Sequence, residues 1–463
     1  MKKRTYYYPL LALLGAMLSL TSCKKDTEDE PPFSTSNLDA ELLELIEAAS
    51  DGAGPHYFRL PASNAYSDIP QDPNNPLSAS KVELGKFLFH ETGIGKNPRM
   101  FTSEGQFSCA SCHHAAAGFQ AGIAQGIGEG GFGFGLAGEG RTVHPEYFNN
   151  PIWSDSLDVQ PIRSPSALNV AFQTNMLWNG QFGATHVNEG TSHAWTAGTP
   201  KEFNNLGFHG VETQAIAGQV VHRQMVDHDF CVEYADYMDL FQNAFGDVPQ
   251  SIEELRIHSG LAIAAYERTL LANQAPFQKW LAGSRSLMSD SEKRGAMLFF
   301  GKAECSSCHT GPALNSMEFH AYGMNDIYTS PMAIMASESD EENLGRGGFT
   351  GNQEDMYKFK VPQLYNLREA GFLGHGSSFK SIREVVEYKN AGIPENPMVP
   401  AGQLAAEFTP LLLTPDEVDD LVNFLENALN DPHLDRYVPS ELPTGMCFPN
   451  ADTQSMIDHG CAE

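Results

Sequence analysis

Hydrophobic residues along this chain recur mainly with the three-to-four-residue spacing of α-helices, and there is little of the alternation typical of β-strands. Three of the predicted helices begin at a Ser or Thr that is followed three residues later by Glu, a combination typical of helix N-termini. In the last of them, one apolar face is formed by Val418, Leu421, Val422, Leu425 and Leu429. The predicted helices span residues 38–49, 251–272, 289–300 and 414–429.

A glycine-rich segment at residues 126–140 interrupts the helical pattern. Glycine loses more backbone freedom on folding than other residues, so we expect an irregular loop here rather than a helix or strand. Glycines of this kind can form a phosphate-binding loop, but no Lys-Ser or Lys-Thr pair follows and no strand precedes them. The segment is therefore predicted to be a structural loop.

Two parts of the chain repeat the same theme. Residues 82–89 lead to Cys-Ala-Ser-Cys-His at residues 109–113, and residues 293–300 lead to Cys-Ser-Ser-Cys-His at residues 305–309. Each copy has a predicted helix with an internal glycine and a Phe-rich end, followed by the cysteine motif. The duplication predicts two related domains that meet near residues 275–290.

The Cys-x-x-Cys-His sequence is the signature of covalent c-type haem attachment. The thiols add to the vinyl groups of the haem, and the histidine reaches the iron from the proximal side. A zinc ribbon would need its cysteine pairs about 15–20 residues apart, a thioredoxin-like pair would need a βαβ pattern, and a disulfide would need no histidine. We therefore predict two covalently bound haem c groups, held by Cys109, Cys112 and His113 and by Cys305, Cys308 and His309.

Composition and charge limit the kinds of partner that the protein is expected to bind. The chain has 463 residues, of which 41% are hydrophobic, which is enough for packed cores. Its 29 Lys and Arg against 58 Asp and Glu give a formal net charge of −29. Such acidity excludes nucleic acid as a partner and disfavours anionic membrane surfaces. It favours an electron donor with a basic docking face.

The first residues resemble an export signal. Basic residues precede a short apolar stretch at residues 9–20, and the sequence Leu-Thr-Ser-Cys ending at Cys23 resembles a bacterial lipobox, whose cysteine carries lipid. A plain secretory signal is the alternative. The predicted location is the periplasm, with the chain attached to the membrane only through its lipid. In an exported protein Cys447 and Cys461 are close enough in sequence for a disulfide, and Cys231 is expected to be a buried free thiol.

Further segments resemble the bacterial di-haem cytochrome c peroxidase family, which includes the methylamine-utilisation di-haem enzymes. The resemblance covers residues 70–440 and includes both haem motifs. The other matching segments are Leu84-Gly-Lys-Phe-Leu-Phe89, Arg163-Ser-Pro-Ser-Ala-Leu-Asn169, Leu177-Trp178-Asn-Gly180, Ala262-Ile-Ala-Ala-Tyr-Glu-Arg-Thr-Leu270 and Phe359-Lys-Val-Pro-Gln-Leu-Tyr-Asn366.

The resemblance implies an all-α fold of two cytochrome c-like haem domains with long irregular loops. The N-terminal haem is implied to bind and split hydrogen peroxide, and the C-terminal haem to take electrons from a small c-type cytochrome or similar donor. Trp178 matches a tryptophan that lies between the haems and assists electron transfer, with an ordinary core tryptophan as the alternative. A homodimer is implied by the resemblance alone.

One departure from the family pattern concerns peroxide cleavage, which needs a distal group that moves a proton between the two oxygens. Family members place a Gln there and, ten residues later, a catalytic Glu. Gln214 matches the first, but Gln224 replaces the acid, and an amide cannot shuttle a proton at neutral pH. Glu212 is a candidate substitute, unless it is a solvated loop acid.

A second departure lies in the glycine-rich segment, where the family offers a histidine as a reversible distal ligand. The corresponding position here is Glu129. We expect this carboxylate to be a weak ligand or the missing acid–base group, or else a loop residue that faces water. Without the histidine, the N-terminal haem is expected to stay open in the oxidised protein.

A third departure concerns the distal ligand of the C-terminal haem, which is Met or Tyr in the family. Lys389 occupies that position and Tyr388 precedes it, with Met324 and Met398 as other candidates. A lysine ligand must be deprotonated, which burial favours. The family's calcium site between the haems is unsupported, because Ser164 stands where asparagine is expected.

The sequence therefore predicts a cytochrome c peroxidase that reduces hydrogen peroxide to water. The alternatives are a di-haem oxidase of a protein or organic substrate, and a non-enzymatic di-haem electron carrier or sensor. The predicted organisation is a signal peptide at 1–22, a lipid-anchored tether with a short helix at 23–70, a peroxidatic domain at 71–283, an electron-accepting domain at 284–440 and a tail at 441–463.

Overall fold

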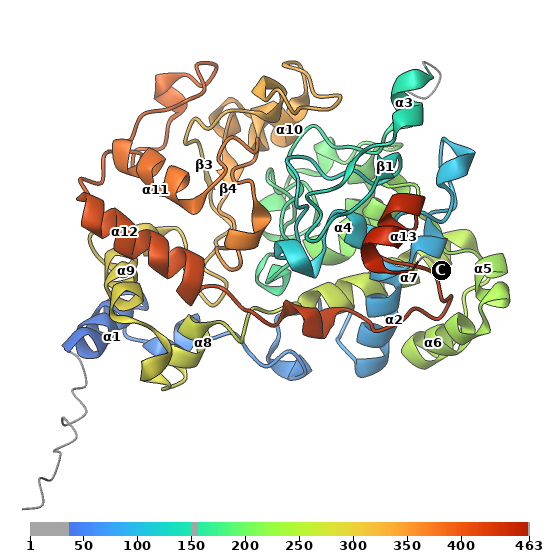
Figure 1. Ribbon diagram of the computed structural model, residues 1–463, viewed down its shortest axis with the longest axis horizontal. Helices are drawn as coiled ribbons and strands as arrows, with labels where there is room; N and C mark the ends of the chain where they lie inside the picture. Colours follow the sequence, from blue (N-terminus) through green and yellow to red (C-terminus); the bar gives the residue numbers. More distant parts are fainter. Residues whose placement is uncertain (1–36, 151–155, 462–463) are drawn as a thin grey trace, which may run out of the picture.

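The computed structural model describes residues 37–150 and 156–461, so the predicted export signal and Cys23 lie outside the described residues. Helices and irregular loops form the body of the molecule (Figure 1). Within the described ranges, no helix has both the length and the apolar character needed to cross a membrane. The α-helices are α1 (Asn37–Ala49), α2 (Ala79–His90), α3 (Pro145–Asn149), α4 (Gly210–Val221), α5 (His228–Glu233), α6 (Ala235–Phe245), α7 (Ile252–Arg268), α8 (Pro276–Leu281), α9 (Asp290–Phe300), α10 (Arg346–Thr350), α11 (Ile382–Ala391), α12 (Pro415–Asn423) and α13 (Thr453–His459).

Two small antiparallel ribbons complete the regular structure of the described chain. In the first, Gly131 pairs with Val143, which places a two-residue strand inside the glycine-rich segment that we expected to be irregular throughout. In the second, Phe319 pairs with Lys360. The strands are β1 (Gly131–Phe132), β2 (Thr142–Val143), β3 (Phe319–His320) and β4 (Phe359–Lys360). The helix-rich fold agrees with the all-α prediction, and the division into two haem domains remains a prediction.

Helix starts follow the predicted capping signals. The Ser289 side chain accepts a hydrogen bond from the Glu292 amide, and the Glu292 carboxylate accepts one from the Ser289 amide, so α9 begins with a complete capping box. The same box opens α12, and the Ser251 side chain caps α7. Helix α7 ends at Arg268, four residues earlier than predicted, because the chain there turns to shorter-range hydrogen bonds.

The repeated helices α2 and α9 each cross a partner helix at their internal glycine. A Cβ added to Gly85 would lie 1.8 Å from the Ala262 carbonyl oxygen of α7, and one added to Gly295 would lie 2.0 Å from the Asp420 carbonyl oxygen of α12. Only glycine permits such close backbone contact. The duplicated glycine therefore sets both helix crossings, and each repeated helix then leads to a haem-attachment turn.

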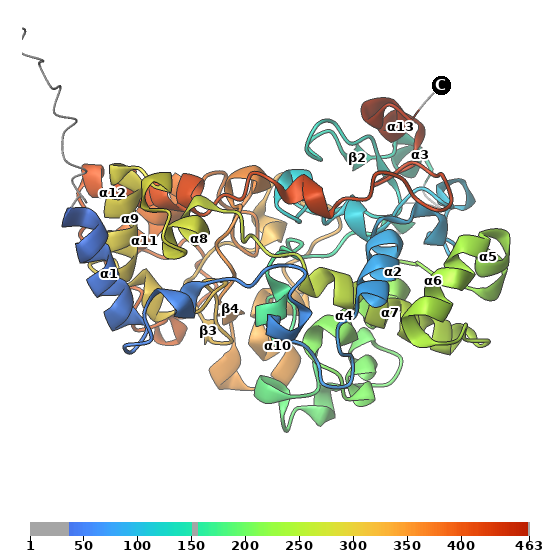
Figure 2. The same ribbon diagram turned by 90° about the horizontal axis from the view of Figure 1, so that it is seen from below.

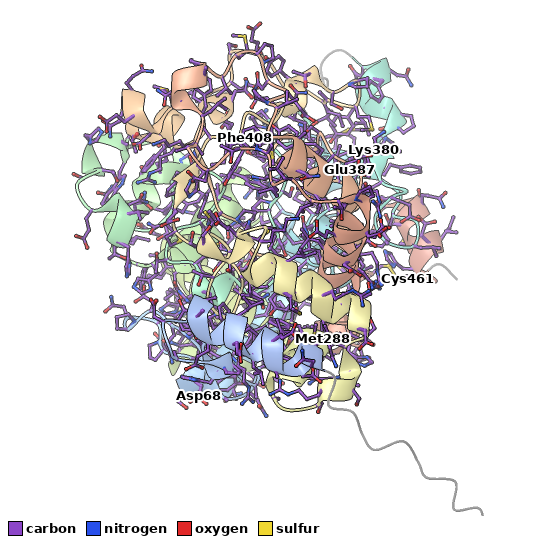
Figure 3. All side chains as sticks on the ribbon, turned by 90° about the vertical axis from the view of Figure 1, so that its left-hand side faces the viewer. Asp68, Met288, Lys380, Glu387, Phe408 and Cys461 are labelled. Carbon is purple, nitrogen blue, oxygen red and sulfur yellow. A yellow bond between two sulfur atoms is a disulfide. The ribbon has the colours of Figure 1, made fainter. Side chains whose placement is uncertain are left out.

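The two ends of the described chain lie on opposite halves of the molecule (Figure 2). Helix α1 packs along α9, as Figure 3 also shows, and Asp39 accepts hydrogen bonds from the Trp280 ring nitrogen and the Lys293 ammonium. The short helix predicted at residues 38–49 is therefore present as α1, and it is docked on the C-terminal half.

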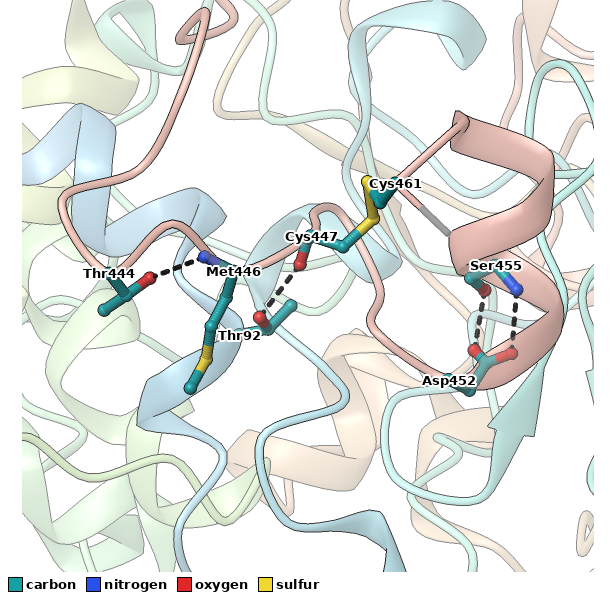
Figure 4. Close-up of a disulfide and its surroundings, with 7 residues drawn as sticks. All are labelled: Thr92, Thr444, Met446, Cys447, Asp452, Ser455 and Cys461. Carbon is teal, nitrogen blue, oxygen red and sulfur yellow. Dashed lines mark hydrogen bonds between the residues drawn. A yellow bond between two sulfur atoms is a disulfide. The ribbon is translucent and has the colours of Figure 1, made fainter. Parts of the chain in front are cut away.

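The C-terminal tail crosses instead to the first haem motif. The side chains of Ser108 and Ser111 both donate hydrogen bonds to the Pro449 carbonyl, at 2.9 and 3.1 Å. The predicted disulfide between Cys447 and Cys461 is present, and the Cys447 carbonyl accepts a hydrogen bond from Thr92 (Figure 4). The prediction of a buried free thiol at residue 231 is also confirmed.

Candidate functional site

Both Cys-x-x-Cys-His motifs form the same short turn. Cys109–Ser111 and Cys305–Ser307 are 3₁₀ turns, and each is closed by a hydrogen bond from the histidine amide to the first cysteine's carbonyl, at 3.1 Å for His113 and 2.9 Å for His309. None of the four motif cysteines forms a disulfide in the described structure. The two turns thus present paired thiols and a histidine in the same order, as covalent haem attachment requires.

The two motif histidines are oriented for metal binding. Nδ1 of His113 lies 3.4 Å from the Phe119 carbonyl, and Nδ1 of His309 lies 3.1 Å from the carbonyls of Leu314 and Pro362. A hydrogen bond of this kind directs the other ring nitrogen toward a metal. Burial lowers the pKa of both imidazoles to about 4, so the neutral, ligating form is present at neutral pH.

The first motif opens onto a cavity, called here the N-terminal cavity. It is lined by the motif residues Cys109, Cys112 and His113 and by polar side chains from α4, α7 and two loops. The predicted site residues Gln214, Gln224 and Trp178 all lie in its wall, and Ser164 does as well. Further titratable residues that the sequence analysis did not single out line it too, among them Asp158, His222, Glu267 and Glu342.

Helix α4 presents three of these residues on one face. Gln214, Gly218 and His222 are four residues apart, so they follow one another along the same side of the helix and its C-terminal cap. Nδ1 of His222 lies 2.9 Å from the carboxylate of Asp158, which is almost fully buried. Burial lowers the pKa of His222, but the charge and hydrogen bond of Asp158 outweigh it, so the net shift is upward.

Glu267 reaches the cavity from α7. It is buried, and its Oε2 has no hydrogen-bond partner in the described structure. Burial, reinforced by the negative charge of Glu212, raises the pKa of Glu267 to about 8, so this carboxyl group is mostly protonated at neutral pH. Gln224 lies nearby and accepts a hydrogen bond from the Cys109 thiol at 3.3 Å. That donor exists only in the free thiol, since a thioether has no hydrogen to give.

The expectation for Glu129 is wrong in both of its forms. The side chain is fully buried rather than facing water, and it does not line the N-terminal cavity. It forms an ion pair with Arg223 and accepts hydrogen bonds from the Met100 amide and the Tyr147 hydroxyl. These contacts occupy the carboxylate, because a buried charge must be paired. Glu129 is therefore an anchor for the loop around Arg223.

Glu212 is likewise neither a solvated loop acid nor a group of the cavity wall. It is buried in α4, and its two oxygens accept hydrogen bonds from Nε and Nη2 of Arg268, at 2.8 and 2.6 Å. This two-pronged pair joins α4 to α7. Its role is to hold the two helices that carry the distal residues.

The second motif opens onto a separate cavity, called here the C-terminal cavity. Cys308, His309 and Lys389 line it. Burial lowers the pKa of Lys389 to about 7, and its ammonium lies 2.7 Å from the centre of the Tyr322 ring. Met324 also lines the cavity, whereas Met398 is exposed and absent from its wall.

Tyr388, the neighbour of Lys389, does not reach this cavity. Its hydroxyl donates a hydrogen bond to the Tyr322 carbonyl at 2.5 Å, and its ring is buried against Phe379 and Phe408. Adjacent residues of a helix point in different directions, about 100° apart. Helix α11 therefore aims Lys389, rather than Tyr388, into the cavity.

The two cavities share a wall that contains Trp178. Arg163, Met176 and Leu177 also line both cavities. The Trp178 ring nitrogen donates a hydrogen bond to the Arg163 carbonyl at 2.9 Å, and its ring lies 6.3 Å from the ring of His375 on the C-terminal side. Trp178 thus lies between the two cavities, and its place between two haems remains a prediction.

Two buried cations indicate what the cavities hold. Arg163 and Lys360 are each about 95% or more buried, and neither pairs with a carboxylate of the described residues. Burial lowers the pKa of Arg163 to about 10 and that of Lys360 to about 7. A buried cation needs a compensating anion, and a haem brings two carboxylates. The cysteine pairs, oriented histidines and unpaired cations together fit two haem c groups.

The fold and the paired motifs define a di-haem c-type cytochrome, and comparison with known proteins makes this class more specific. Residues 79–286 match the family model described as di-haem cytochrome c peroxidase. The chain is 29% identical over 379 residues to the methylamine utilization protein MauG of Methylorubrum extorquens, which covers 81% of this chain and 84% of that protein. It is 27% identical over 420 residues to cytochrome-c peroxidase IdrP1 of Denitromonas iodatirespirans, with 86% and 94% covered. Residues 79–286 thus match the di-haem cytochrome c peroxidase family, and the chain is similar over most of its length to proteins named MauG and cytochrome-c peroxidase.

A solved structure supports the fold independently. The crystal structure of a MauG-like protein associated with microbial copper homeostasis has a TM-score of 0.53 at 22% identity. The match covers 82% of this chain and 96% of that one. At this identity the likeness concerns the fold, and the chemistry must be argued from the cavities themselves.

Sequence reasoning missed His222, Asp158 and Glu267. Asp158 is 64 residues away from His222 in the chain, so no local pattern connects them. One signal was present in the sequence, since His222 follows Gln214 at a helical spacing of eight residues and precedes Gln224 by two. Glu267 lies in the segment Ala262–Leu270 that resembles the family. Only its burial, which the sequence does not show, distinguishes it from an ordinary surface acid.

Proposed function

We propose that this protein is a di-haem cytochrome c peroxidase that reduces hydrogen peroxide to water with electrons from a c-type cytochrome or similar donor. The observation that carries the proposal is the pair of unlike cavities on either side of Trp178. One is lined by Gln214, His222 and Glu267, and the other by Lys389, Lys360 and Tyr322. The match of residues 79–286 to the family model supports the same reaction.

The N-terminal cavity is proposed to bind peroxide. A haem there supplies the iron that binds and reduces the peroxide, with His113 as proximal ligand. The surrounding chain contributes the Gln214 amide, which can donate a hydrogen bond to a bound oxygen, and a neutral Glu267. Cleavage of an O–O bond into water needs such proton donors close to the iron.

The C-terminal cavity is proposed to hold the haem that takes up electrons, and His309 and Lys389 are the residues that would bind its iron. Lys389 lines the cavity while Tyr388 does not. Trp178 is proposed to pass electrons to the peroxide site through the shared wall. The strongly acidic chain favours a donor with a basic face, so the association rate should fall as salt is added.

Location and assembly follow from the sequence alone. We propose a periplasmic lipoprotein anchored through Cys23, and a homodimer is proposed only on the family resemblance. Metabolic labelling with a fatty acid would test the anchor, and replacing Cys23 with Ser should release the protein from the membrane fraction. Light scattering of the purified protein would test the dimer.

The reaction itself is tested by mixing the half-reduced protein with peroxide in a stopped-flow spectrometer and then adding reduced cytochrome c. We expect a fast spectral change at the N-terminal haem, followed by oxidation of the cytochrome. Absence of any fast change would exclude peroxidase activity. A fast change without cytochrome oxidation would favour an oxidase of a protein or organic substrate. The replacement of the acid by Gln224 favours instead a non-enzymatic di-haem electron carrier or sensor, for which no fast change is expected.

A further inference from the structure

The N-terminal cavity contains a histidine–carboxylate pair. His222 is the C-terminal cap of α4, and Asp158 lies on a loop that runs beside the glycine-rich segment. Nδ1 of His222 is 2.9 and 3.0 Å from the two oxygens of Asp158. The Asp158 side chain is 3% exposed, whereas the His222 side chain is 35% exposed, and both residues line the cavity. The exposed part of the imidazole therefore faces the space in which a ligand would bind.

This arrangement fixes the direction of the ring. With Nδ1–H donated to Asp158, the lone pair of the neutral imidazole is on Nε2. In the described structure no hydrogen-bond partner occupies Nε2, so it is available to a molecule in the cavity. A base whose far side is oriented by a carboxylate is the standard construction of a proton-transferring histidine.

Two further contacts keep the pair in place. The Asp158 carbonyl accepts a hydrogen bond from the Gly128 amide, and a Cβ added to Gly128 would lie only 2.2 Å from Oδ2 of Asp158. Arg223, the residue after His222, forms the buried ion pair with Glu129. The glycine-rich segment thus holds the pair through two contacts. Gly128 contacts Asp158, and Glu129 binds Arg223, the residue next to His222.

The helix also leaves room for a small molecule beside the ring. Gly218 lies between Gln214 and His222 on the cavity face of α4, and an added Cβ there would be 3.5 Å from the Gln214 amide nitrogen and 3.9 Å from the His222 ring. A side chain at this position would fill the space between the two polar groups. Glycine keeps it open for a ligand of a few atoms that contacts both.

We propose that His222, oriented by Asp158, is the acid–base group of the peroxide site and replaces the carboxylate that this chain lacks at Gln224. The proposal rests on the proposed peroxidase function. Nε2 would take the proton from one peroxide oxygen and return it to the other, so that the O–O bond breaks and the doubly protonated oxygen leaves as water. Two electrons from the reduced donor, by way of the haem pair, and two protons from solvent complete the conversion of one peroxide into two waters. Asp158 acts as a positioning residue.

Other charged groups near the ring do not offer the same geometry. Arg223 and His113 influence His222 electrostatically, but Arg223 is engaged by Glu129 and His113 belongs to the haem-attachment turn. Glu267 and Glu342 are the other acids in the cavity wall. The electrostatic effect of Glu267 falls on the Cys109 thiol of that turn, and Glu342 interacts with Asp340, Glu341 and Lys201. His222 alone combines an orienting carboxylate, a free ring nitrogen and a place on the same helix face as Gln214.

The test uses the full-length holoprotein in its half-reduced form and three variants, His222→Gln, Asp158→Asn and the control His228→Gln. His228 is exposed and lies six residues further along the chain. Two rates are measured by stopped flow, peroxide reduction and the binding of cyanide, which enters as hydrogen cyanide and must lose a proton to bind iron. General acid–base groups contribute about 10²–10⁴-fold, so His222→Gln should slow both rates by that factor. Asp158→Asn should slow both by a smaller factor, and His228→Gln should change neither.

Each outcome decides the proposal. Unchanged cyanide and peroxide rates in His222→Gln would overturn it, as would a conversion of the N-terminal haem from low spin to high spin, which would make His222 an iron ligand. A loss of cyanide binding in Glu267→Gln but not in His222→Gln would assign the role to Glu267 instead. If the wild-type protein binds cyanide through His222 but does not react with peroxide, the proposed function fails while the proton-transfer assignment stands. Addition of Gln224→Glu to His222→Gln should partly restore both rates.

Discussion

The N-terminal and C-terminal cavities begin from the same construction and end with different chemistry. In both, a glycine-containing helix crosses a partner helix and leads to a Cys-x-x-Cys-His turn whose histidine is oriented by backbone carbonyls. The cavity walls that lie away from the haem-attachment turns carry different side chains. The N-terminal cavity has Gln214, His222 and Glu267 there, and the C-terminal cavity has Lys389 beside Tyr322. The haem-attachment motif is thus duplicated, and the side chains that differ between the two cavities come from outside the repeat.

The helices behind the two walls are also held together differently. Arg268 joins α7 to α4 through a buried pair with Glu212, whereas Arg294 joins α9 to α12 through a pair with Asp420 in which the arginine side chain is 49% exposed. Burial makes an ion pair costly to break, because the remaining charge loses both its partner and its solvent. An exposed pair leaves a charge that water can solvate.

The largest effect is therefore expected from breaking the buried pair. Arg268→Ala should lower the free energy of unfolding by about 3–5 kcal/mol, since it leaves Glu212 charged and buried. Arg294→Ala, the matched change on the C-terminal side, should cost about 1 kcal/mol or less. Urea denaturation of both holoprotein variants, followed by circular dichroism, measures the difference. Equal losses of unfolding free energy in the two variants would show that the two ion pairs contribute equally to stability.

The next prediction concerns the wall that distinguishes the C-terminal cavity. Lys389→Met should change the absorption spectrum of the C-terminal haem and raise its reduction potential, because a thioether ligand stabilises the reduced iron. We expect a rise on the order of 0.1 V, a part of the ~0.8 V range over which axial ligands tune haem. Spectroelectrochemical titration reports it, and the N-terminal haem should keep its potential.

Tyr388→Phe is the control for this change. It removes a hydroxyl that bonds to the Tyr322 carbonyl outside the cavity, so the ligand of the C-terminal haem should be unaffected. If Tyr388→Phe alters the spectrum and Lys389→Met does not, then the lysine is not the ligand.

How far these sites were predictable depends on the distance between their parts in the chain. The haem motifs and the helix caps were predicted correctly because each is contained within a few residues, as in the box formed by Ser289 and Glu292. His222 and Asp158 were not, because a loop reversal brings them together across 64 residues. Glu129 was placed by counting along a glycine-rich loop, and counting gives no information about the direction of a side chain. Lys389 and Tyr388 were distinguished only by the rotation of α11.

Glu267 allows a test of how the burial of a carboxyl group in the N-terminal cavity affects the stability of the protein. Its pKa is raised to about 8 in the folded protein from an ordinary value of 4.5, so the unfolded chain loses this proton first. Below pH 4.5 the group is protonated in both the folded and the unfolded chain, and the free energy of unfolding does not depend on its titration. Between pH 4.5 and about 8 the free energy of unfolding falls, by at most ~1.4 kcal/mol per pH unit. Glu267→Gln imitates the protonated acid and should remove this loss.

Thermal unfolding of the two holoproteins, followed by circular dichroism, checks the sign. At pH 5 the variant and the wild type should have similar melting temperatures, and above pH 8 the variant should be the more stable. No comparable buried, unpartnered carboxylate lines the C-terminal cavity of the described chain, where Asp326 is engaged by His375. A variant that is less stable at every pH would mean that the carboxyl group makes a specific contact in the holoprotein.

The smallest change tests the wall that both cavities share. Trp178→Phe keeps an aromatic ring and removes the hydrogen bond to the Arg163 carbonyl, which should cost about 1 kcal/mol of stability. If Trp178 carries electrons between the haems, reoxidation of the C-terminal haem after peroxide is added should slow, while cyanide binding at the N-terminal haem stays unchanged. Trp195→Phe is the control, because that ring also donates one hydrogen bond but lines neither cavity. If both variants lose the same stability but only the Trp178 variant transfers electrons more slowly, Trp178 takes part in electron transfer. If electron transfer is unchanged in both variants, Trp178 only packs between the two cavities.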